Sequence, residues 1–503
     1  MQSHILESLL KRNPETYEWE SSLAKEWEQS PDGRTFLFRL YKGLKWSDGK
    51  PLTAQDVKFS LEAYKNPAYE GIRHISVLEN IKGVKIIDDH TIQFITKKPH
   101  FKNFSIVSKM LILPEHIYRV PEYHSLSKMD KNPSKAKNIK PHLNRIIVGS
   151  GPYKFLQYQQ GKILVLTRNQ TWFGRKIPSN KGQWNFKNIA FRFVSSRIDS
   201  FLRMQKGELD FVGLSAGEFV RDTFKAQKGV EIEKIKYALQ QSYSSYIGWN
   251  LKNPLFQDQR TRRALAHLLN RQFINEKLGF NLNKLSTGPW TSWSEYADSS
   301  VKPLLFNPKK ASMLLQAAGW EDTNKDGILE KDFNGRRRDF SFTVIAVNES
   351  SNLEKYLTIF QEDLKRAGIR LSIQFLGMTS MLAVFDERKF DAIFFGDGFD
   401  VDIDPRPWHS ASIKKGRYNY IGYSNSKVDR LIEEAEQQFD RKKRIKILKE
   451  AYRLIANEVP CLFVFDYPYR FYAINKRIHT PKPSFKYNLG MSFWSIKKIK
   501  PEN

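Results

Sequence analysis

The length of the chain constrains its fold more than any single motif. A hydrophobic core stops growing at about 250–300 residues, and longer chains divide into separately packed units. The chain has 503 residues, of which 40% are hydrophobic and 13% aromatic. We therefore predict two or three packed units with enough apolar surface to fill them. The aromatic residues suit either a ligand pocket or large cores, and composition leaves both open.

The charge of the chain is strongly basic, with 82 Lys and Arg against 54 Asp and Glu, a formal net charge of +28. Such a balance attracts polyanions and anionic membrane surfaces. The basic residues are spread over nearly every segment, and the densest cluster, 441–444, falls on a helical pattern where we expect a solvated face. We predict no nucleic-acid partner.

Cysteine, hydropathy and metal-ligand patterns narrow the class further. Cys461 stands alone in the sequence, within an apolar run, so it is predicted to be a core residue and forms no intramolecular disulfide. No apolar stretch approaches the roughly 20 residues needed to cross a bilayer, and Met1 is not followed by an export leader. Clusters with metal-ligand spacing are absent, so we expect neither a metal nor a cofactor.

Helical and strand patterns alternate along the chain, which predicts a mixed α/β fold. A turn sequence leads into a strand over 35–40, and Thr53 with Asp56 forms a capping box for the next helix. Residues 307–319 begin with a cap and a proline and end with a glycine, as helices do. The lysine-rich residues 126–141 lack periodicity and are predicted to form an exposed loop.

One short motif suggests an enzyme. Residues 213–217 fit the G-x-S-x-G turn of serine hydrolases, with Ser215 as the nucleophile. A triad also needs a base, and the histidines that follow, His267, His409 and His479, lie in no persuasive motif. A serine hydrolase using Ser215 is the alternative function.

A second motif looks like half of a calcium loop. Residues 322–327 place oxygen ligands at alternate positions and a glycine at the turn. Phe333 stands where the bidentate glutamate belongs, so a polar turn ahead of a strand is the better interpretation.

An acidic stretch follows an apolar run. After residues 391–396 come Asp397, Asp400, Asp402 and Asp404. A buried ammonium group needs a paired carboxylate, whose charge-assisted hydrogen bonds offset the cost of desolvation. A carboxylate here suits a cationic ligand group. The alternative is an acidic surface loop or a cap for the helix that follows.

Short segments with a recognisable order run through nearly the whole chain. They are Ser22–Ala24 with Trp27, Ser30–Gly33, Phe36–Leu40, Trp46–Pro51, Thr53–Val57, Gly149–Tyr153, Arg168-Asn169, Asn250, Pro254–Phe256, Arg260–Leu265 with Asn270-Arg271, Ala311–Trp320, Asn419-Tyr420, Asp429 and Leu431. In these segments the chain resembles the family 5 extracellular solute-binding proteins of ABC importers, the group of dipeptide, oligopeptide and nickel binders. Residues 417–422 are similar to the YejA-like branch, a weaker resemblance.

The resemblance implies a two-lobed α/β fold, the periplasmic-binding-protein fold of type II in its large cluster-C form, with mixed sheets and a hinge. Lobe I would hold residues 1–254, with 9–145 as an inserted subdomain. Lobe II would hold residues 255–474, and residues 475–503 would return to lobe I. Closure would follow from the ligand's higher affinity for the closed form.

The resemblance also implies a function. The chain would be the substrate-binding component of an ABC importer, a monomer without enzymatic activity that captures a peptide or peptide-like solute between two closing lobes and delivers it to a membrane permease. Members normally carry an export signal and a first strand of lobe I, which are missing here. Either Met1 is internal to a longer reading frame, which we expect, or lobe I has lost a strand and is less stable. A periplasmic or cell-envelope location follows from the family alone.

The resemblance finally implies ligand-binding residues. In peptide-binding members, an aspartate after an apolar strand and a small residue holds the α-ammonium group of the ligand. Gly396-Asp397 resembles that pair, and Asp404-Pro405 matches the Asp-Pro that follows. Because residues are inserted between the two pairs, Asp400 or Asp402 are alternative anchors.

Aromatic side chains complete the predicted site. The candidates for lining a pocket are Tyr246, Trp249, Trp290, Trp293 and Trp408. Each of them could instead pack in a core.

Overall fold

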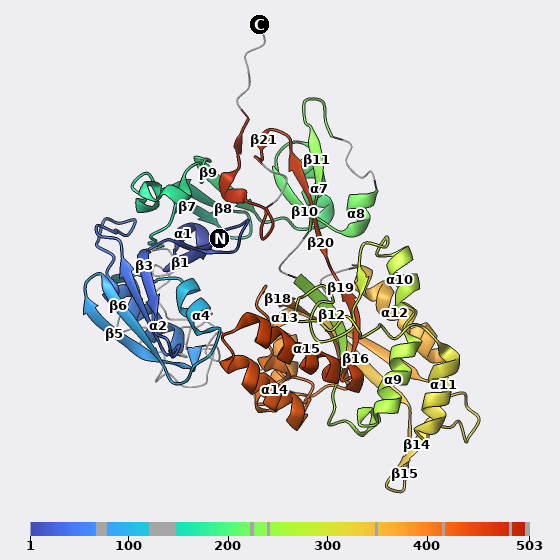
Figure 1. Cartoon of the computed structure of the whole chain (residues 1–503). Helices are drawn as coiled ribbons and strands as arrows, with labels where there is room; N and C mark the ends of the chain where they lie inside the picture. Colours follow the sequence, from blue (N-terminus) through green and yellow to red (C-terminus); the bar gives the residue numbers. More distant parts are fainter. Residues whose placement is uncertain are drawn as a thin grey trace, which may run out of the picture. The chain divides into compact units, whose positions relative to one another are not determined.

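The computed structural model of the chain describes residues 2–66, 78–119, 147–221, 226–238, 242–347, 351–414, 418–481 and 485–497. The predicted loop over 126–141 and Arg417 of the YejA-like run lie outside these residues. The chain forms two compact units, which can be followed by colour in Figure 1. Unit 1 comprises residues 1–212, 224–235 and 473–503, and unit 2 comprises residues 213–223 and 236–472.

The two compact units divide the chain at other residues than the predicted lobes do. We place the first boundary after residue 254 from the sequence, whereas the chain enters unit 2 at Lys236 because strand β12 (Ser242–Trp249) belongs to the central sheet of that unit. Residues 213–223, predicted in lobe I, also belong to unit 2. The chain returns to unit 1 after Tyr472, close to the predicted residue 474.

Unit 1 is built from small sheets and short helices. Its larger sheets have the orders β3-β4-β6-β5 and β7-β8-β9 and are antiparallel. The strands are β1 (Leu10–Arg12), β2 (Trp19–Ser21), β3 (Ala24–Gln29), β4 (Thr35–Leu40), β5 (Ile81–Asp88), β6 (Thr91–Thr96), β7 (Tyr153–Gln159), β8 (Ile163–Arg168), β9 (Asn188–Arg192), β21 (Ile478–His479) and β22 (Ser495–Ile496). The helices are α1 (Gln2–Ile5), α2 (Ala54–Lys65), α4 (Asn103–Lys109), α5 (Glu115–Tyr118) and α7 (Arg197–Gln205).

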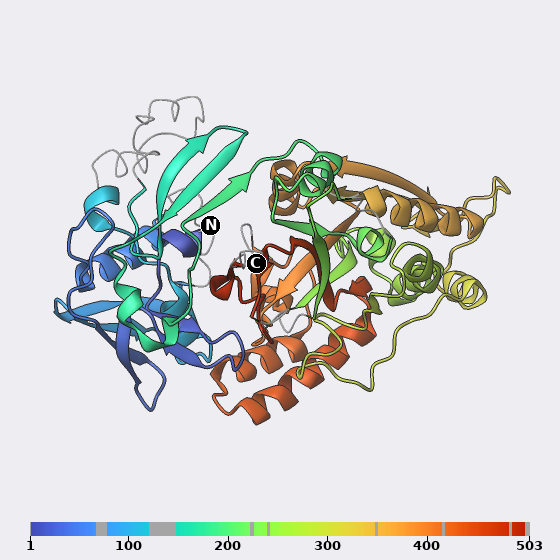
Figure 2. The same ribbon diagram turned by 90° about the horizontal axis from the view of Figure 1, so that it is seen from above.

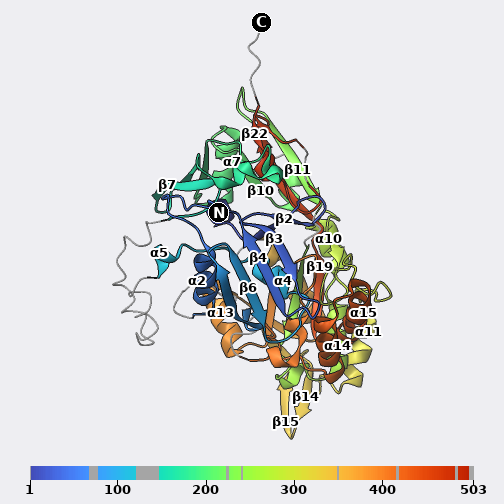
Figure 3. The same ribbon diagram turned by 60° about the vertical axis from the view of Figure 1, so that its left-hand side comes forward.

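Local sequence signals explain the first sheet of unit 1. Strand β4 covers the predicted residues, and its alternate side chains are buried in a core that helix α2 also covers (Figure 3). The predicted capping box starts α2: the Thr53 amide donates to the Asp56 carboxylate at 2.9 Å, and the Thr53 hydroxyl accepts from the first turn. This core runs from Leu9 to Val148 and is separate from the core under β7 and β8.

Unit 2 contains a six-stranded sheet of the order β13-β19-β12-β18-β16-β17. Besides β12, this sheet contains β13 (Lys284–Leu285), β16 (Ser341–Val347), β17 (Arg370–Leu376), β18 (Ala392–Phe399) and β19 (Cys461–Asp466). Strands β14 (Glu330–Phe333) and β15 (Arg336–Asp339) form a separate two-stranded sheet. The helices are α8 (Ala216–Val220), α9 (Gln259–Leu268), α10 (Arg271–Lys277), α11 (Pro308–Ala317), α12 (Ser351–Arg366), α13 (Met378–Glu387), α14 (Ser426–Gln437) and α15 (Arg441–Glu458).

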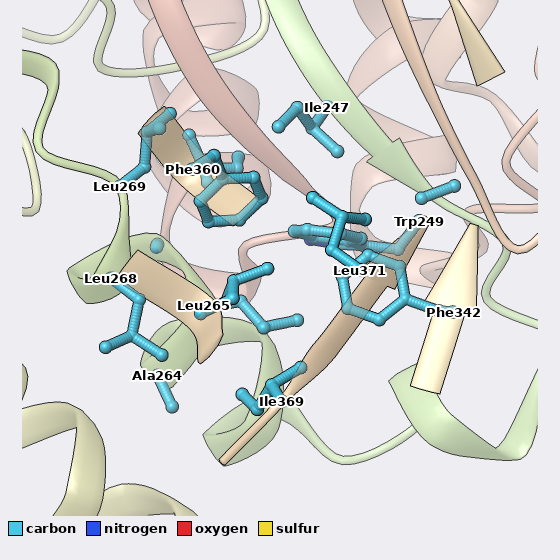
Figure 4. Packing of buried hydrophobic residues seen from close by; sticks show 14 of the residues in the cluster. Ile247, Trp249, Ala264, Leu265, Leu268, Leu269, Phe342, Phe360, Ile369 and Leu371 are labelled. Carbon is cyan, nitrogen blue, oxygen red and sulfur yellow. The ribbon is translucent and has the colours of Figure 1, made fainter. Parts of the chain in front are cut away.

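Parallel crossovers organise the unit 2 sheet. Strand β16 is parallel to β17 and β18, and helices α12 and α13 make the connections in the order β16-α12-β17-α13-β18. Strand β12 runs antiparallel between β18 and β19. Figure 4 shows the apolar core that this arrangement buries, with Trp249 among Leu265, Phe342 and Leu371.

Strands β10 (Phe211–Leu214), β11 (Ile232–Ala238) and β20 (Tyr469–Asn475) form a further sheet of the order β10-β20-β11. Helices α14 and α15 of unit 2 lie side by side (Figure 2). In the described part of the chain, no helix has both the length and the apolar character to cross a membrane.

The structure tests two predictions about exposure to solvent in unit 2. Cys461 is buried in the core, as predicted. The predicted solvated face over 441–444 is wrong at Arg444, which is buried. Its guanidinium donates to the carbonyl oxygen of Gln438 at 2.7 Å, and this hydrogen bond offsets part of the cost of burying the charge. Residues 441–443 are exposed.

Candidate functional site

A hollow of about 540 Å³ lies within unit 2. Aromatic and aliphatic side chains dominate its wall. The described lining residues are Gly213, Leu214, Ala216, Tyr243, Ser245, Leu278, Gly279, Asn283, Val347, Leu353, Tyr356, Met378, Phe394, Phe395, Gly396, Tyr467, Tyr469, Arg470, Phe471 and Tyr472. Such a volume with such a wall is typical of small-molecule sites.

The sheet topology explains where the hollow lies. Val347 ends β16, Met378 follows β17, Gly396 lies near the end of β18, and Tyr467 follows β19. These four strands point the same way, since β16 to β18 are parallel and β19 and β18 both run antiparallel to β12. Ligands in α/β sheets bind beyond the carboxyl ends of the strands, which is the edge that these residues occupy.

Strands β12 and β18 form the floor of the hollow. Ser245 pairs with Gly396 in the antiparallel register. A Cβ atom on Gly396 would lie 2.3 Å from the hydroxyl of Tyr243, so the absence of a side chain lets the Tyr243 ring cover the strand. The hydroxyls of Ser245 and Tyr467 form a hydrogen bond of 3.0 Å across the floor.

Arg470 is the charged side chain among the described residues that line the hollow. Its guanidinium carbon lies 5.4 Å from the centre of the Tyr243 ring. Burial raises the pKa of Tyr472, and the nearby charge of Arg470 opposes that shift. Within the described ranges, no carboxylate forms an ion pair with Arg470.

Asp397 lies beside the hollow and faces the other side of the sheet. Neighbouring side chains of a strand point to opposite faces, and Asp397 pairs with Ser244 while Gly396 pairs with Ser245. Asp397 is half-buried and accepts a hydrogen bond from the Tyr246 hydroxyl. Burial raises the pKa of Asp397 to about 6, and this hydrogen bond opposes the shift.

The other acids of the stretch have partners within unit 2. Asp402 accepts a hydrogen bond from the Tyr296 hydroxyl at 3.0 Å and lies 3.9 Å from the guanidinium groups of Arg441 and Arg444. Asp404 accepts from the Arg406 amide at 3.1 Å, as a cap does. The Asp400 carboxylate accepts from the amide of its neighbour Val401 at 2.8 Å.

The five predicted pocket aromatics are dispersed, and none is among the described residues that line the hollow. Trp249 and Trp290 are both 0% exposed: Trp249 stacks on Phe256 at 5.1 Å between ring centres, and Trp290 packs on Tyr452 at 5.4 Å. These two side chains therefore pack in the core of unit 2.

The other three lie nearer to solvent or to Asp397. Trp293 is half-buried, with the ammonium of Lys284 at 5.4 Å from its ring centre. Trp408 is half-buried and packs against Tyr423. Tyr246 contributes the hydrogen bond to Asp397.

Four of the lining aromatics that were not predicted come from one short segment. Tyr467, Tyr469, Phe471 and Tyr472 follow directly after β19. The signal for them was present in the sequence, because residues 465–472 contain five aromatic side chains around a proline and an arginine. An aromatic run of this density beyond a buried strand is a sequence signal for residues that line a pocket.

The two other motifs have structural roles. Ser215 is the N-cap of α8: its hydroxyl accepts from the Glu218 amide at 3.3 Å, and its own amide donates to the Glu218 carboxylate at 2.6 Å. The segment 322–327 is a polar turn ahead of β14, in which the Gly327 amide donates to Asp322 at 3.0 Å. Among the residues that the structure describes, no group of His, Cys, Asp or Glu could hold a metal ion.

An α/β unit with an aromatic hollow at the carboxyl ends of its strands, joined to a second compact unit, is the arrangement of a solute-binding protein. The family model of the bacterial extracellular solute-binding proteins, family 5 Middle, matches residues 18–419, and the chain belongs to this family. The fold is therefore the two-lobed α/β fold that the resemblance implied.

Individual relatives agree with this assignment. The oligopeptide-binding protein AppA of Bacillus subtilis (strain 168) is 30% identical over 503 residues, covering 98% of this chain and 86% of that protein. The structure of AppA from Bacillus subtilis in complex with a nonapeptide matches with a TM-score of 0.80 at 27% identity, covering 99% of this chain and 94% of that one. NikZ from Campylobacter jejuni in complex with Ni(L-His) shares the fold, with a TM-score of 0.77 at 23% identity over 98% of this chain and 94% of that one.

Proposed function

We propose that the protein binds a peptide or peptide-like solute and supplies it to the membrane permease of an ABC importer. The observation that carries this proposal is the hollow itself, a cavity of about 540 Å³ with many aromatic side chains at the carboxyl ends of the unit 2 strands. The similarity to an oligopeptide-binding protein supports a peptide as the ligand class.

Asp397 remains our first choice for the residue that holds the α-ammonium group. It has no ion-pair partner in the described part of the chain, and burial raises its pKa to about 6. An ammonium group paired with this carboxylate would offset the cost of burying its charge. Asp400 is the second choice. Asp402 is disfavoured because Tyr296 and two arginines already surround it.

The proposed role includes no chemistry. Ser215 serves as a helix cap, and the described residues that line the hollow include no histidine, aspartate or glutamate that could act as the base of a hydrolase. We expect the protein to act as a monomer in the periplasm or cell envelope, as members of its family do, and not to bind nucleic acid, since its basic residues are spread over many segments.

Mass spectrometry under native conditions tests the ligand class. The protein is purified without denaturation, its intact mass is measured, and the bound species is released with acid and fragmented. We expect peptide fragments, and we expect the same peptides to rebind after denaturation, dialysis and refolding. A released sugar, metal chelate or lipid that rebinds while peptides do not would overturn the proposal.

A further inference from the structure

We propose, on the basis of the proposed function, that the unit 2 hollow selects ligands in which an aromatic or large aliphatic side chain lies next to a carboxylate, and that Arg470 determines this selectivity by pairing with the carboxylate. The inference concerns which peptides bind. It follows from the aromatic side chains of the wall, from the partners that some of its polar groups already have and from its charge.

Aromatic side chains make up a large part of the wall. The ring centres of Tyr243 and Tyr467 are 5.7 Å apart, and those of Tyr469 and Phe471 are 6.3 Å apart. Phe394 lies on the floor strand β18. These spacings are those of packed aromatic pairs, so a ligand ring or branched chain can extend the cluster and bury apolar surface.

Some polar groups of the wall are already paired with neighbouring groups. The hydroxyls of Ser245 and Tyr467 are bonded to each other. The main-chain amide of Asn283 donates to the Asn275 side chain at 3.3 Å. A ligand amide or hydroxyl group at these positions would lose its water and find a partner that is already occupied, which disfavours small polar side chains there.

The charge of the wall favours a ligand carboxylate. Arg470 contributes a cation, and the described lining residues include no carboxylate. Its guanidinium is placed against the Tyr243 ring, which fixes the group beside the apolar wall. A ligand carboxylate would gain charge-assisted hydrogen bonds there, whereas a lysine or arginine side chain of the ligand would meet a like charge.

The carboxylate could be the terminal group of a peptide or the side chain of an aspartate or glutamate. Both present the same chemistry to a guanidinium, so the experiment separates them. Peptides of one length are prepared with Phe, Leu, Ala or Lys at the last position, each as the free acid and as the carboxamide. A further set carries a Phe-Asp pair before a carboxamide end.

Affinities are measured by isothermal titration calorimetry with the ligand-free full chain. For the natural sequence we expect the Phe and Leu peptides to bind about tenfold or more tightly than the Ala peptide, and the Lys peptide to bind least. We expect amidation to weaken the Phe peptide by about tenfold if the terminal carboxylate is the partner. If the side-chain carboxylate is the partner, the Phe-Asp carboxamide retains the affinity.

Variants assign the effect to one residue. Arg470→Met should abolish the difference between acid and amide while the preference for Phe over Ala persists. Lys236→Met is the matched control: the Lys236 ammonium lies 4.9 Å from the Tyr469 ring centre, but Lys236 does not line the hollow. The control should leave the difference unchanged. If Arg470→Met does not fold, the acid and amide series on the natural sequence still decides.

Two outcomes overturn the inference and differ from each other. Peptides that bind equally well whatever their last side chain and terminal group would refute the selectivity and leave peptide binding intact. No measurable binding of any peptide, by a chain that binds another solute class, would refute the proposed function and the selectivity with it.

Discussion

A single half-buried carboxyl group, Asp397, is the residue on which ligand recognition is expected to depend. Its neighbours are the Tyr246 hydroxyl and the buried Cys461, and neither supplies a positive charge. Burial raises the pKa of Asp397 to about 6, above its ordinary value of 3.8. The folded chain therefore holds this proton more tightly than the unfolded chain does, and the carboxyl lowers stability as pH rises through the interval from about 4 to about 6.

This titration predicts a pH-dependent affinity. An α-ammonium group pairs with the ionised carboxylate, so affinity for a peptide with a free amino terminus should fall as pH decreases below about 6, by up to tenfold per pH unit. Asp397→Asn should weaken the same peptide by about 2–5 kcal/mol at pH 7.5 and remove the slope. Titration calorimetry from pH 5 to 8 measures both.

The matched ligand is the N-acetylated peptide, which has no ammonium group and should show no slope with either protein. A slope that persists in Asp397→Asn would contradict the assignment, and Asp400→Asn would be the next variant to measure.

Ser215 gives a second prediction at the residue scale. Ser215→Ala removes the acceptor of the capping box and should lower the free energy of unfolding by about 1 kcal/mol, with peptide affinity unchanged. Ser215→Asp, which keeps a capping acceptor, should retain stability. Urea titrations give the stabilities, and an ester hydrolysis that is present in the natural chain and lost in Ser215→Ala would favour an enzyme after all.

At the scale of elements, the accuracy of prediction depends on whether the signal is local. The cap of α2 at Thr53 and the cap of α11 at Asn307 involve residues within one turn, so the sequence reveals them. The burial of Trp249 depends on which strands flank β12. These are β18 and β19, which lie more than 100 residues away in the sequence. The sequence alone therefore leaves Trp249 open between pocket and core.

The same reasoning applies to the candidate site. The Gly396-Asp397 pair, which lies in strand β18, could be singled out because an apolar run that stops at a glycine and an acid is visible in the sequence. The side of the sheet that each residue faces is fixed by pairing with Ser244 and Ser245, which no local pattern reports. Arg470 is one of 82 basic residues and cannot be selected without the fold.

Strands β12 and β18 supply a prediction at this scale. A methyl group at Gly396 would overlap the Tyr243 hydroxyl and ring, so Gly396→Ala should displace the ring and weaken ligand binding by about tenfold or more, with a small effect on stability. Gly83→Ala is the matched control, since Gly83 lies in strand β5 with open space at its Cβ position. Unchanged affinity in Gly396→Ala would show that the position of the Tyr243 ring is irrelevant to binding.

At the scale of the whole molecule, the two units have separate cores, and we expect them to unfold in separate steps. Calorimetry should show two transitions. Leu265→Ala in the unit 2 core should lower one transition, by about 2–5 kcal/mol in free energy, and peptide at 100 times its Kd should raise the same transition by about 2.7 kcal/mol.

A matched substitution in unit 1, Leu61→Ala, should lower the other transition. A single transition that moves as a whole in both variants would show that the two units unfold cooperatively.

The solitary thiol in strand β19 has a practical consequence for studying this molecule. Cys461 is 0% exposed, and burial raises the pKa of its thiol. While unit 2 is folded, a reagent that needs a thiolate can neither reach the sulfur nor find it ionised. The rate at which this sulfur is labelled therefore reports how often unit 2 opens. No engineered probe is needed, because the natural sequence already contains one reporter and no competing sulfhydryl.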